Sequence, residues 1–474
     1  MFKHLSSIVI LSFFSVAALQ AQTMSLSDCI DFALEHNTTI EQRKLAEENQ
    51  RVQLNNSKNN RLPTLNASMS QGWGFGRSTG RDGTTIDRTS ANTSFNLSTS
   101  VPLFTGFRIP NQIKSDEYSL KAASENLRQA RRNVSVQVAT YYLNALYYRG
   151  LVDVQRRQVE LDKAALEKAQ ALVDAGKKPQ SEVASAEAQV ALSEHSLTEA
   201  IGNETLARLD LMQMLNLDGD VRTFSIVDLD GFENQNEDSS NPSNLAIPSK
   251  PSNLSNPANL SNPSNPSNPS TALLPDQVFE EAVANFPSIL AAQYSLESSR
   301  HQLKVARSGY LPTLSLSASY SNSYNYIYDM DNMRLNKQLD LNGSEYIGLS
   351  LNIPIFDRFQ TRNSMRQAKL NIESQNTALI EARQSLHKEI QQAYWNAQKA
   401  RDNYASSQKA NASTSLAYRY EADRYDSGKG TAYDLQQART RMEKAQHDEV
   451  QAKYEYLMRI KILESYLEPD AKIK

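Results

Sequence analysis

The residue types that most often carry out chemistry are spread thinly along the chain. Its six histidines are far apart, and no two of them have the close spacing that a metal site requires. They are His4, His36, His195, His301, His387 and His447. The glycine-rich run 72–76 is not followed by the Gly-Lys-Ser of a phosphate-binding loop, so we interpret it as a loop at strand tips. No serine, histidine and aspartate set for nucleophilic catalysis can be assembled. The sequence predicts a protein that is not an enzyme and needs no metal or cofactor.

Two acidic residues share a spacing that suggests a different role. Glu182 stands six positions after Gly176, and Asp434 stands six positions after Gly428. One interpretation is a ring of negative charge at a constriction, which would concentrate cations. The other is helix capping, because Thr431 to Asp434 matches a capping box. Both interpretations stay open, and one acid can fill both roles.

The two glycines belong to an internal repeat. The interval from Phe104 to Gly176 is 72 positions, and the interval from Phe356 to Gly428 is the same. An identical interval indicates two copies of one rod, and internal repeats decide folds. The paired motifs are RLPTLNAS (61–68) with YLPTLSLS (310–317), VPLFTGFR (101–108) with IPIFDRFQ (353–360), and DAGKKP (174–179) with DSGKGT (426–431).

The repeats set the predicted domain organisation. The first repeat spans 22–234 and the second spans 273–474, each in the order helix, strand, strand, helix, helix. Residues 1–21 have the basic start and short apolar run of a secretory signal peptide. Residues 235–272 form a linker rich in asparagine, proline and serine, which disfavours helix and strand alike. Cys29 is the one cysteine, and we expect it to be a buried small residue rather than a lipid-attachment site.

Long helices are predicted from apolar residues that recur every seven positions, as along the seam of a coiled coil. About 65 helical residues at a rise of about 1.5 Å would make a rod of about 100 Å. Gly176 and Gly428 stand where such a helix stops in the left-handed conformation. The recurring residues are Leu120, Leu127, Val134, Tyr141 and Tyr148 in the first copy and Ile372, Leu379, Leu386, Ala393 and Ala400 in the second.

Strands are predicted on either side of the prolines. Pro63 and Pro312 end a helix and start an extended segment, and Pro102 and Pro354 stand where the second strand of each repeat leads into the long helix. Alternation of apolar and small polar residues over about ten positions fits a membrane β-strand or a soluble hairpin equally well. Aromatic residues near the strand ends favour the membrane strand, since such residues collect at membrane interfaces. They are Trp73, Phe75, Tyr320, Tyr324, Tyr326 and Tyr328.

Four strands cannot close a barrel, because the smallest filled barrels need about eight. An open sheet edge in lipid would leave backbone groups unpaired, at a cost of several kcal/mol each. Three copies would supply twelve strands and twelve helices. The predicted fold class is therefore mainly α with a membrane β-barrel: long coiled-coil helices form an α-barrel, and four β-strands per chain close into a 12-stranded barrel by trimerisation. The partners are two further copies and membrane lipid, while a formal net charge of −3 argues against nucleic acid.

Together these motifs resemble the TolC family of outer membrane efflux proteins over nearly all of the mature chain. The resemblance implies a trimeric conduit that lies in outer membrane lipid, with its helical part extending into the periplasm. It also implies that the conduit works with a periplasmic adaptor (membrane fusion) protein and an inner-membrane transporter to export small molecules or polypeptides. Drug efflux, metal efflux and protein secretion remain open. A structural trimeric coiled-coil protein of adhesin type is the alternative; it explains the heptads but not the duplicated strands.

The resemblance also assigns roles at the two glycine turns. It implies that they are adaptor-docking tips, and that Glu182, Asp434 and Tyr425 form the periplasmic gate. Relatives carry a basic residue two positions after the second glycine, where this chain has Gly430. The residues of the two docking turns are Ala175, Gly176 and Lys177, and Ser427, Gly428 and Lys429.

Overall fold

The computed structural model describes residues 23–79, 83, 85–228 and 275–467. The predicted signal peptide (1–21) and linker (235–272) lie outside the described residues. The chain divides into two compact units. The helical unit lies within 1–41, 130–282 and 387–474, and the sheet unit lies within 42–129 and 283–386.

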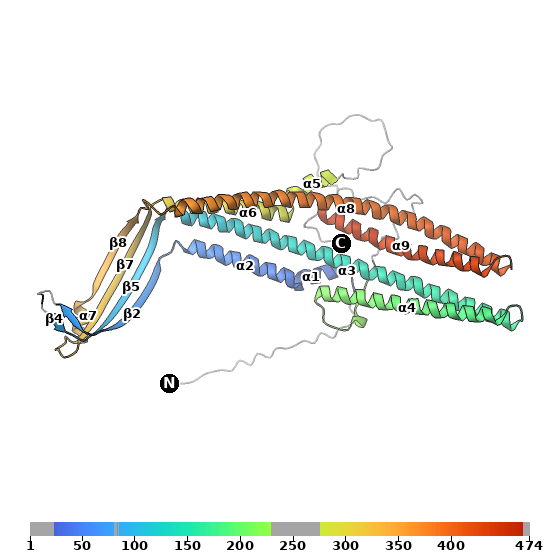
Figure 1. The fold of residues 1–474 in the computed structure, drawn as a ribbon, viewed down its shortest axis with the longest axis horizontal. Helices are drawn as coiled ribbons and strands as arrows, with labels where there is room; N and C mark the ends of the chain where they lie inside the picture. Colours follow the sequence, from blue (N-terminus) through green and yellow to red (C-terminus); the bar gives the residue numbers. More distant parts are fainter. Residues whose placement is uncertain (1–22, 80–82, 84, 229–274, 468–474) are drawn as a thin grey trace, which may run out of the picture. The chain divides into compact units, whose positions relative to one another are not determined.

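The sheet unit contains four antiparallel strands in the order β2-β5-β7-β8 (Figure 1). Their bounds are β2 Thr64–Gly74, β5 Ser90–Thr105, β7 Thr313–Ile327 and β8 Ser344–Asn352. The strands β5 and β7 each pair on both sides. Among the described residues, β2 and β8 each pair on one side and leave the other edge open. The remaining elements of the strand region are β3 (Arg77–Thr79), β4 (Thr85–Asp87) and α7 (Leu335–Leu341).

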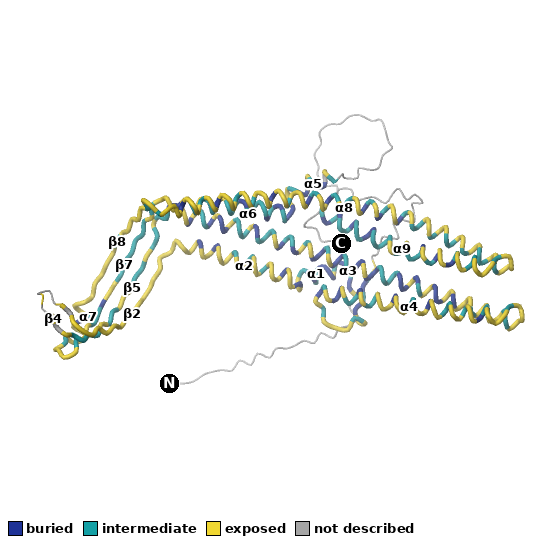
Figure 2. The backbone as a smooth tube through the Cα atoms, in the orientation of Figure 1, coloured by how far each residue is buried: buried dark blue, intermediate teal, exposed yellow. Residues whose placement is uncertain are grey.

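The strand register separates apolar from hydroxyl-bearing residues, because successive side chains point to opposite faces of a sheet. The apolar rows include Leu65–Thr99–Ala318–Ile347 and Ala67–Leu97–Tyr320, and a neighbouring polar row is Thr64–Ser100–Ser317–Gly348. Across the four strands, Glu345 is the one charged residue. The edge strands β2 and β8 are exposed along nearly their whole length (Figure 2). One chain therefore presents an uncovered apolar face and two unpaired sheet edges.

The four motif prolines lie at or near the ends of these strands. Pro63 and Pro312 directly precede β2 and β7, and Pro354 follows the end of β8. Pro102 lies inside β5, where the pairing register with β7 shifts between Pro102 and Phe104. Pro102 is paired with Ser315, and Leu103 is the residue that the shift leaves without a partner in β7. Proline inside a sheet is found mainly at edges and at such irregularities, because it cannot donate to the ladder.

Two interpretations of the strand tips were wrong. The segment 72–74 is part of β2 and pairs with residues 90–92 of β5, so it is not a loop. Tyr320 lies in the middle of β7, opposite Leu97, rather than near a strand end. In both places the ladder continues beyond the point at which glycine or aromatic residues suggested an end.

The strands connect to the long helices through a duplicated left-handed turn. Gly106 and Phe107 have φ of 61° and 63°, and Arg358 and Phe359 have φ of 57° and 63°. In each turn the phenylalanine packs edge-on against the phenylalanine three positions earlier, at centroid distances of 5.2 and 5.5 Å. The first copy uses glycine, which adopts this conformation freely, whereas the second copy places arginine there.

The helix before each Leu-Pro-Thr motif is two helices, so the prediction of one continuous helix was wrong. They are α1 (Leu26–His36) and α2 (Thr38–Asn59), and α5 (Pro275–Val283) and α6 (Pro287–Arg307). Asn37 is extended and its side-chain oxygen accepts a 2.9 Å bond from the Thr39 amide, which restarts the helix. Pro287 occupies the first turn of α6, where its missing N–H costs nothing. Cys29 is fully buried in α1, as expected, and burial raises the pKa of its thiol to about 12.

The long helices confirm the duplicated rod. Helices α3 (Arg108–Asp174) and α8 (Gln360–Asp426) each contain 67 residues. The returning helices α4 (Gln180–Leu215) and α9 (Ala432–Leu467) each contain 36 residues. In the described part of the chain, no helix combines the length and apolar character that a membrane span requires.

The predicted heptad seam matches the buried residues better in the second copy. Leu379, Leu386, Ala393 and Ala400 are all buried. In the first copy Leu127 and Val134 are buried, but Tyr141 is 38 % exposed and the adjacent Tyr142 is buried instead. A straight helix drifts from a strict seven-residue repeat, which moves the buried face by one position over several turns.

Candidate functional site

Both long helices of the helical unit end in the same glycine turn. Gly176 and Gly428 have φ of 68° and 71°, in the left-handed region. The Gly176 amide donates to the Val173 carbonyl at 2.8 Å, and the Lys177 amide donates to the Leu172 carbonyl at 2.9 Å. The second turn repeats both bonds from Gly428 and Lys429 at 3.0 and 2.9 Å. These are Schellman motifs, which satisfy the last free carbonyls of a helix.

The six residues of the two turns are exposed. They are Ala175, Gly176, Lys177, Ser427, Gly428 and Lys429. A Cβ added at Gly176 or Gly428 would meet no other atom within 4 Å, so the glycines are needed for their backbone conformation and not for space. Each turn therefore presents a lysine next to a fixed backbone.

Tyr425 joins the two turns through side chains of the first repeat. Its hydroxyl donates to Glu182 Oε2 at 2.8 Å. Lys178 Nζ donates to the same hydroxyl at 3.2 Å and lies 4.5 Å from the centroid of the Tyr425 ring. Lys178 Nζ is also 3.7 Å from Glu182 Oε1. We call Lys178, Glu182 and Tyr425 the Tyr425 cluster.

Asp434 has different partners from Glu182, although the two acids are equivalent in the repeat. The Thr431 hydroxyl donates to Asp434 Oδ2 at 2.8 Å, and the Asp434 amide donates to the Thr431 hydroxyl at 3.1 Å. The position of Thr431 is occupied by Pro179 in the first repeat, and Pro179 caps α4 without a side-chain bond. Because proline has no hydroxyl, the Glu182 carboxylate remains available to Tyr425.

The electrostatics of the Tyr425 cluster favour a charged lysine. The pKa of the Lys178 ammonium is raised above its ordinary value, chiefly by its hydrogen bond to Tyr425, with the charge of Glu182 adding to the effect. A raised pKa means that the ammonium stays protonated at all physiological pH values. The cluster therefore contains one fixed positive and one negative charge on either side of a phenol.

Sequence reasoning missed a second contact between the hairpins, a buried ion pair. Arg439 of α9 donates to Asp162 of α3, and their side chains are 10 % and 2 % exposed. Arg439 Nε also donates to Glu443 at 2.7 Å, and Gln158 Nε2 donates to Asp162 Oδ1 at 3.2 Å. Burial alone would lower the pKa of Arg439, but the bonds to Glu443 and Asp162 outweigh it and raise this pKa. Asp162 lies two heptads, or fourteen positions, after Tyr148, the last residue of the predicted apolar seam. An acid at a seam position was the sequence signal that could have indicated a buried ion pair.

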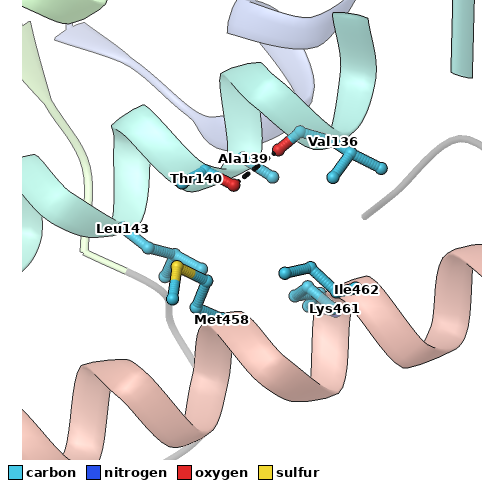
Figure 3. Close-up of a pocket in the computed structure, with 7 residues that line it drawn as sticks. All are labelled: Val136, Ala139, Thr140, Leu143, Met458, Lys461 and Ile462. Carbon is cyan, nitrogen blue, oxygen red and sulfur yellow. Dashed lines mark hydrogen bonds between the residues drawn. The ribbon is translucent and has the colours of Figure 1, made fainter. Parts of the chain in front are cut away.

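A pocket between α3 and α9 is lined mainly by apolar side chains (Figure 3). Within it, the Thr140 hydroxyl donates to the Val136 carbonyl of its own helix at 2.8 Å. The described residues contain no group of three or more histidines, cysteines or acids placed to hold a metal ion. The pocket is lined by Val136, Ala139, Thr140, Leu143, Met458, Lys461 and Ile462.

The model of the family described as "Outer membrane efflux protein" matches residues 29–217 and again 278–467. The outer membrane efflux protein BepC of Brucella suis biovar 1 is 23 % identical over 362 residues, which cover 75 % of this chain and 69 % of that protein. The outer membrane protein TolC of Escherichia coli is 26 % identical over 193 residues, which cover 38 % of this chain and 37 % of TolC.

Solved structures show the same fold at low sequence identity. A solved structure of CusC matches with a TM-score of 0.72 and 16 % identity; in CusC, conformational changes accompany folding and transmembrane channel formation. The match covers 93 % of this chain and 91 % of CusC.

Proposed function

The chain belongs to the outer membrane efflux protein family, and we propose that three copies close a single channel through the outer membrane. The sheet unit supports this proposal directly: its apolar face is uncovered and its β2 and β8 edges are open in one chain. In lipid, open edges are untenable unless other copies pair with them. The polar face of serine, threonine and glycine then lines the lumen.

The acids at the glycine turns are the charges that select ions in this proposal. The four-stranded sheet contains one charged residue, Glu345, which lies opposite Tyr320 on the apolar face. The polar face of these four strands, which lines the lumen in the proposed trimer, is therefore uncharged. Glu182 and Asp434 lie in the first turns of α4 and α9, just after the glycine turns, and in the proposed trimer these turns surround the narrow periplasmic mouth. Six carboxylates per trimer at this narrow mouth favour cations.

The expected result of neutralising these acids is a loss of cation preference. In Glu182→Gln with Asp434→Asn, hydrogen-bonding capacity is kept and six charges per trimer are removed. The reversal potential of the purified trimer in a planar bilayer with a salt gradient should move toward zero. Tyr425→Ala should raise the single-channel conductance severalfold, because it removes the Tyr425–Glu182 hydrogen bond between the two turns and leaves the exposed Lys168–Asp426 ion pair beside it.

Two controls separate the outcomes of this experiment. Glu187→Gln neutralises an exposed acid farther along α4 and should leave the reversal potential unchanged. An unchanged reversal potential in the double variant, with the trimer intact, would assign both acids to helix structure alone. A wild-type trimer that does not conduct would refute the channel itself.

The exposed turns are the proposed docking tips for a periplasmic adaptor, which links the channel to an inner-membrane transporter. The docking role is supported by the exposure of Lys177 and Lys429, each of which is next to a glycine in the left-handed conformation. Such a surface allows side-chain changes without loss of the helix ends. The exported cargo is a small molecule or a polypeptide delivered by that transporter.

Replacing both lysines by tryptophan should abolish export in cells while leaving the trimer intact. The reason is steric, since a bulky side chain at each tip keeps an adaptor hairpin from seating between the turns. Export of a dye by cells that contain the variant is the measurement, and bilayer conductance of the purified variant is the control. Normal export from this double variant would remove the turns from the docking surface.

A further inference from the structure

The first repeat carries a lysine where the second repeat carries a glycine. Lys178 is two positions after Gly176, and Gly430 is two positions after Gly428. A Cβ at Gly430 would lie 3.0 Å from the Tyr425 amide nitrogen and 3.2 Å from the Arg424 carbonyl carbon. Both neighbours are backbone atoms in the helix end, so they have little freedom to move. The second repeat therefore disfavours a side chain at position 430. The cation that contacts Tyr425 is instead Lys178 of the first repeat.

We propose that Lys178 is the residue that holds the periplasmic mouth closed within each chain and that it also sets the charge of the mouth. This inference rests on the proposed channel function. Three contacts carry it: the bond to the Tyr425 hydroxyl, the position beside the Tyr425 ring, and the pairing with Glu182. The two contacts with Tyr425 connect the α3–α4 turn to the last turn of α8, and the pair with Glu182 fixes the ammonium within the first repeat. All three contacts lie inside one chain.

The geometry makes Lys178 more than a counter-ion for Glu182. The Tyr425 hydroxyl accepts a hydrogen bond from Lys178 and donates one to Glu182, so it lies between the two charged groups and bonds to both. A hydrogen bond with a charged partner on each side is stronger than one between neutral groups. Loss of the ammonium would leave Tyr425 with one of its two polar partners. The link between the turns would then open more often.

The same lysine moderates the charge of the mouth. One positive charge lies 3.7 Å from Glu182 in every chain, so Glu182 contributes little net charge while Lys178 is present. Asp434 bonds within its own turn to Thr431 and is not paired with the cation of the Tyr425 cluster. Lys178 therefore offsets one of the two acids, Glu182 and Asp434, that each chain places at the mouth.

The test compares methionine at Lys178 with methionine at Lys163, an exposed lysine of α3 that pairs with Glu194. Lys178→Met keeps the aliphatic stem and removes the charge, and Lys163→Met removes one exposed charge farther along the long helix. Lys178→Met should shift the reversal potential toward cations, because it removes three positive charges per trimer. The mean conductance should rise roughly fivefold in Lys178→Met, since charge-assisted bonds are lost there, and stay near the wild-type value in Lys163→Met. Lys178→Arg, which keeps a charged donor, should restore the closed state.

A double variant checks that Lys178 acts through Tyr425. Lys178→Met should add nothing to the conductance of Tyr425→Ala, because the partner is already absent. A structural measurement accompanies it: an amine-reactive reagent should modify Lys178 more slowly than Lys177, and Tyr425→Ala should remove this protection. The modified peptides are quantified by mass spectrometry.

The possible results separate this inference from the proposed function. If the wild-type trimer conducts and the two methionine variants have equal conductance, Lys178 does not hold the mouth and the channel proposal stands. If Lys178→Met still raises the conductance of Tyr425→Ala, the lysine acts by charge alone and the inference is wrong. A wild-type trimer that fails to conduct would overturn the channel proposal, and the role of Lys178 would fall with it.

Discussion

Replacing Arg439 with methionine is expected to lower the free energy of unfolding by about 3 kcal/mol, because it leaves a buried carboxylate without its cation. Asp162 is 2 % exposed, and its Oδ2 atom already has no hydrogen-bond partner. After the change, Asp162 would keep the 3.2 Å bond from Gln158 as its remaining polar contact here. Methionine fills most of the arginine volume, so the loss is electrostatic rather than a packing defect. The measurement is thermal unfolding of the purified trimer, followed by far-ultraviolet circular dichroism.

An exposed ion pair of Lys163, which is next to Asp162 in α3, provides a matched control. Lys163 Nζ lies 2.8 Å from Glu194, with side chains 57 % and 51 % exposed. Such a pair contributes about 0–1 kcal/mol, so Lys163→Met should hardly change the unfolding temperature. Adding Asp162→Leu to Arg439→Met should recover much of the lost stability, because an apolar pair needs no solvation. Equal effects of Arg439→Met and Lys163→Met would contradict the buried-pair account.

The repeat made the long helices predictable from sequence. Identical intervals from Phe104 to Gly176 and from Phe356 to Gly428 require rods of equal length, and both long helices contain 67 residues. The strands followed from the prolines and from alternation with a period of two. These signals depend on neighbouring residues alone. Each signal also occurs in both repeats, so a prediction made for one repeat can be checked against the other.

The features that sequence did not predict depend on tertiary contacts or on side-chain competition. The buried Tyr142 replaces Tyr141 because the helix face drifts, and the break at Asn37 depends on one side-chain cap. The left-handed Arg358 has no sequence signal, since only its repeat partner Gly106 is a glycine. At the candidate site, Glu182 and Asp434 looked equivalent. Their partners differ because Thr431 has a hydroxyl and Pro179 has none.

A lysine at position 97 should prevent stable insertion of the barrel, while a lysine at position 98 should be tolerated. Leu97 lies near the middle of β5, is 44 % exposed in one chain and is opposite Ala67 and Tyr320. This apolar face meets lipid in the proposed trimer, where a lysine at the membrane midplane costs about 2–4 kcal/mol. The trimer has three such sites, so the cost is incurred three times. Far less heat-resistant trimer should be recovered from outer membrane fractions.

Ser98 is the matched control, because adjacent residues of a strand point to opposite faces. It pairs with Asn66 and Ser319 on the polar face, which lines the aqueous lumen in the proposed trimer. Ser98→Lys should therefore yield a normal amount of trimer, with the reversal potential shifted toward anions by three added positive charges. The comparison holds strand position and side chain constant and changes only the face. Normal assembly of Leu97→Lys together with failure of Ser98→Lys would mean that the barrel is oriented with its polar face outward, and equal behaviour of both would mean that this sheet does not lie in lipid.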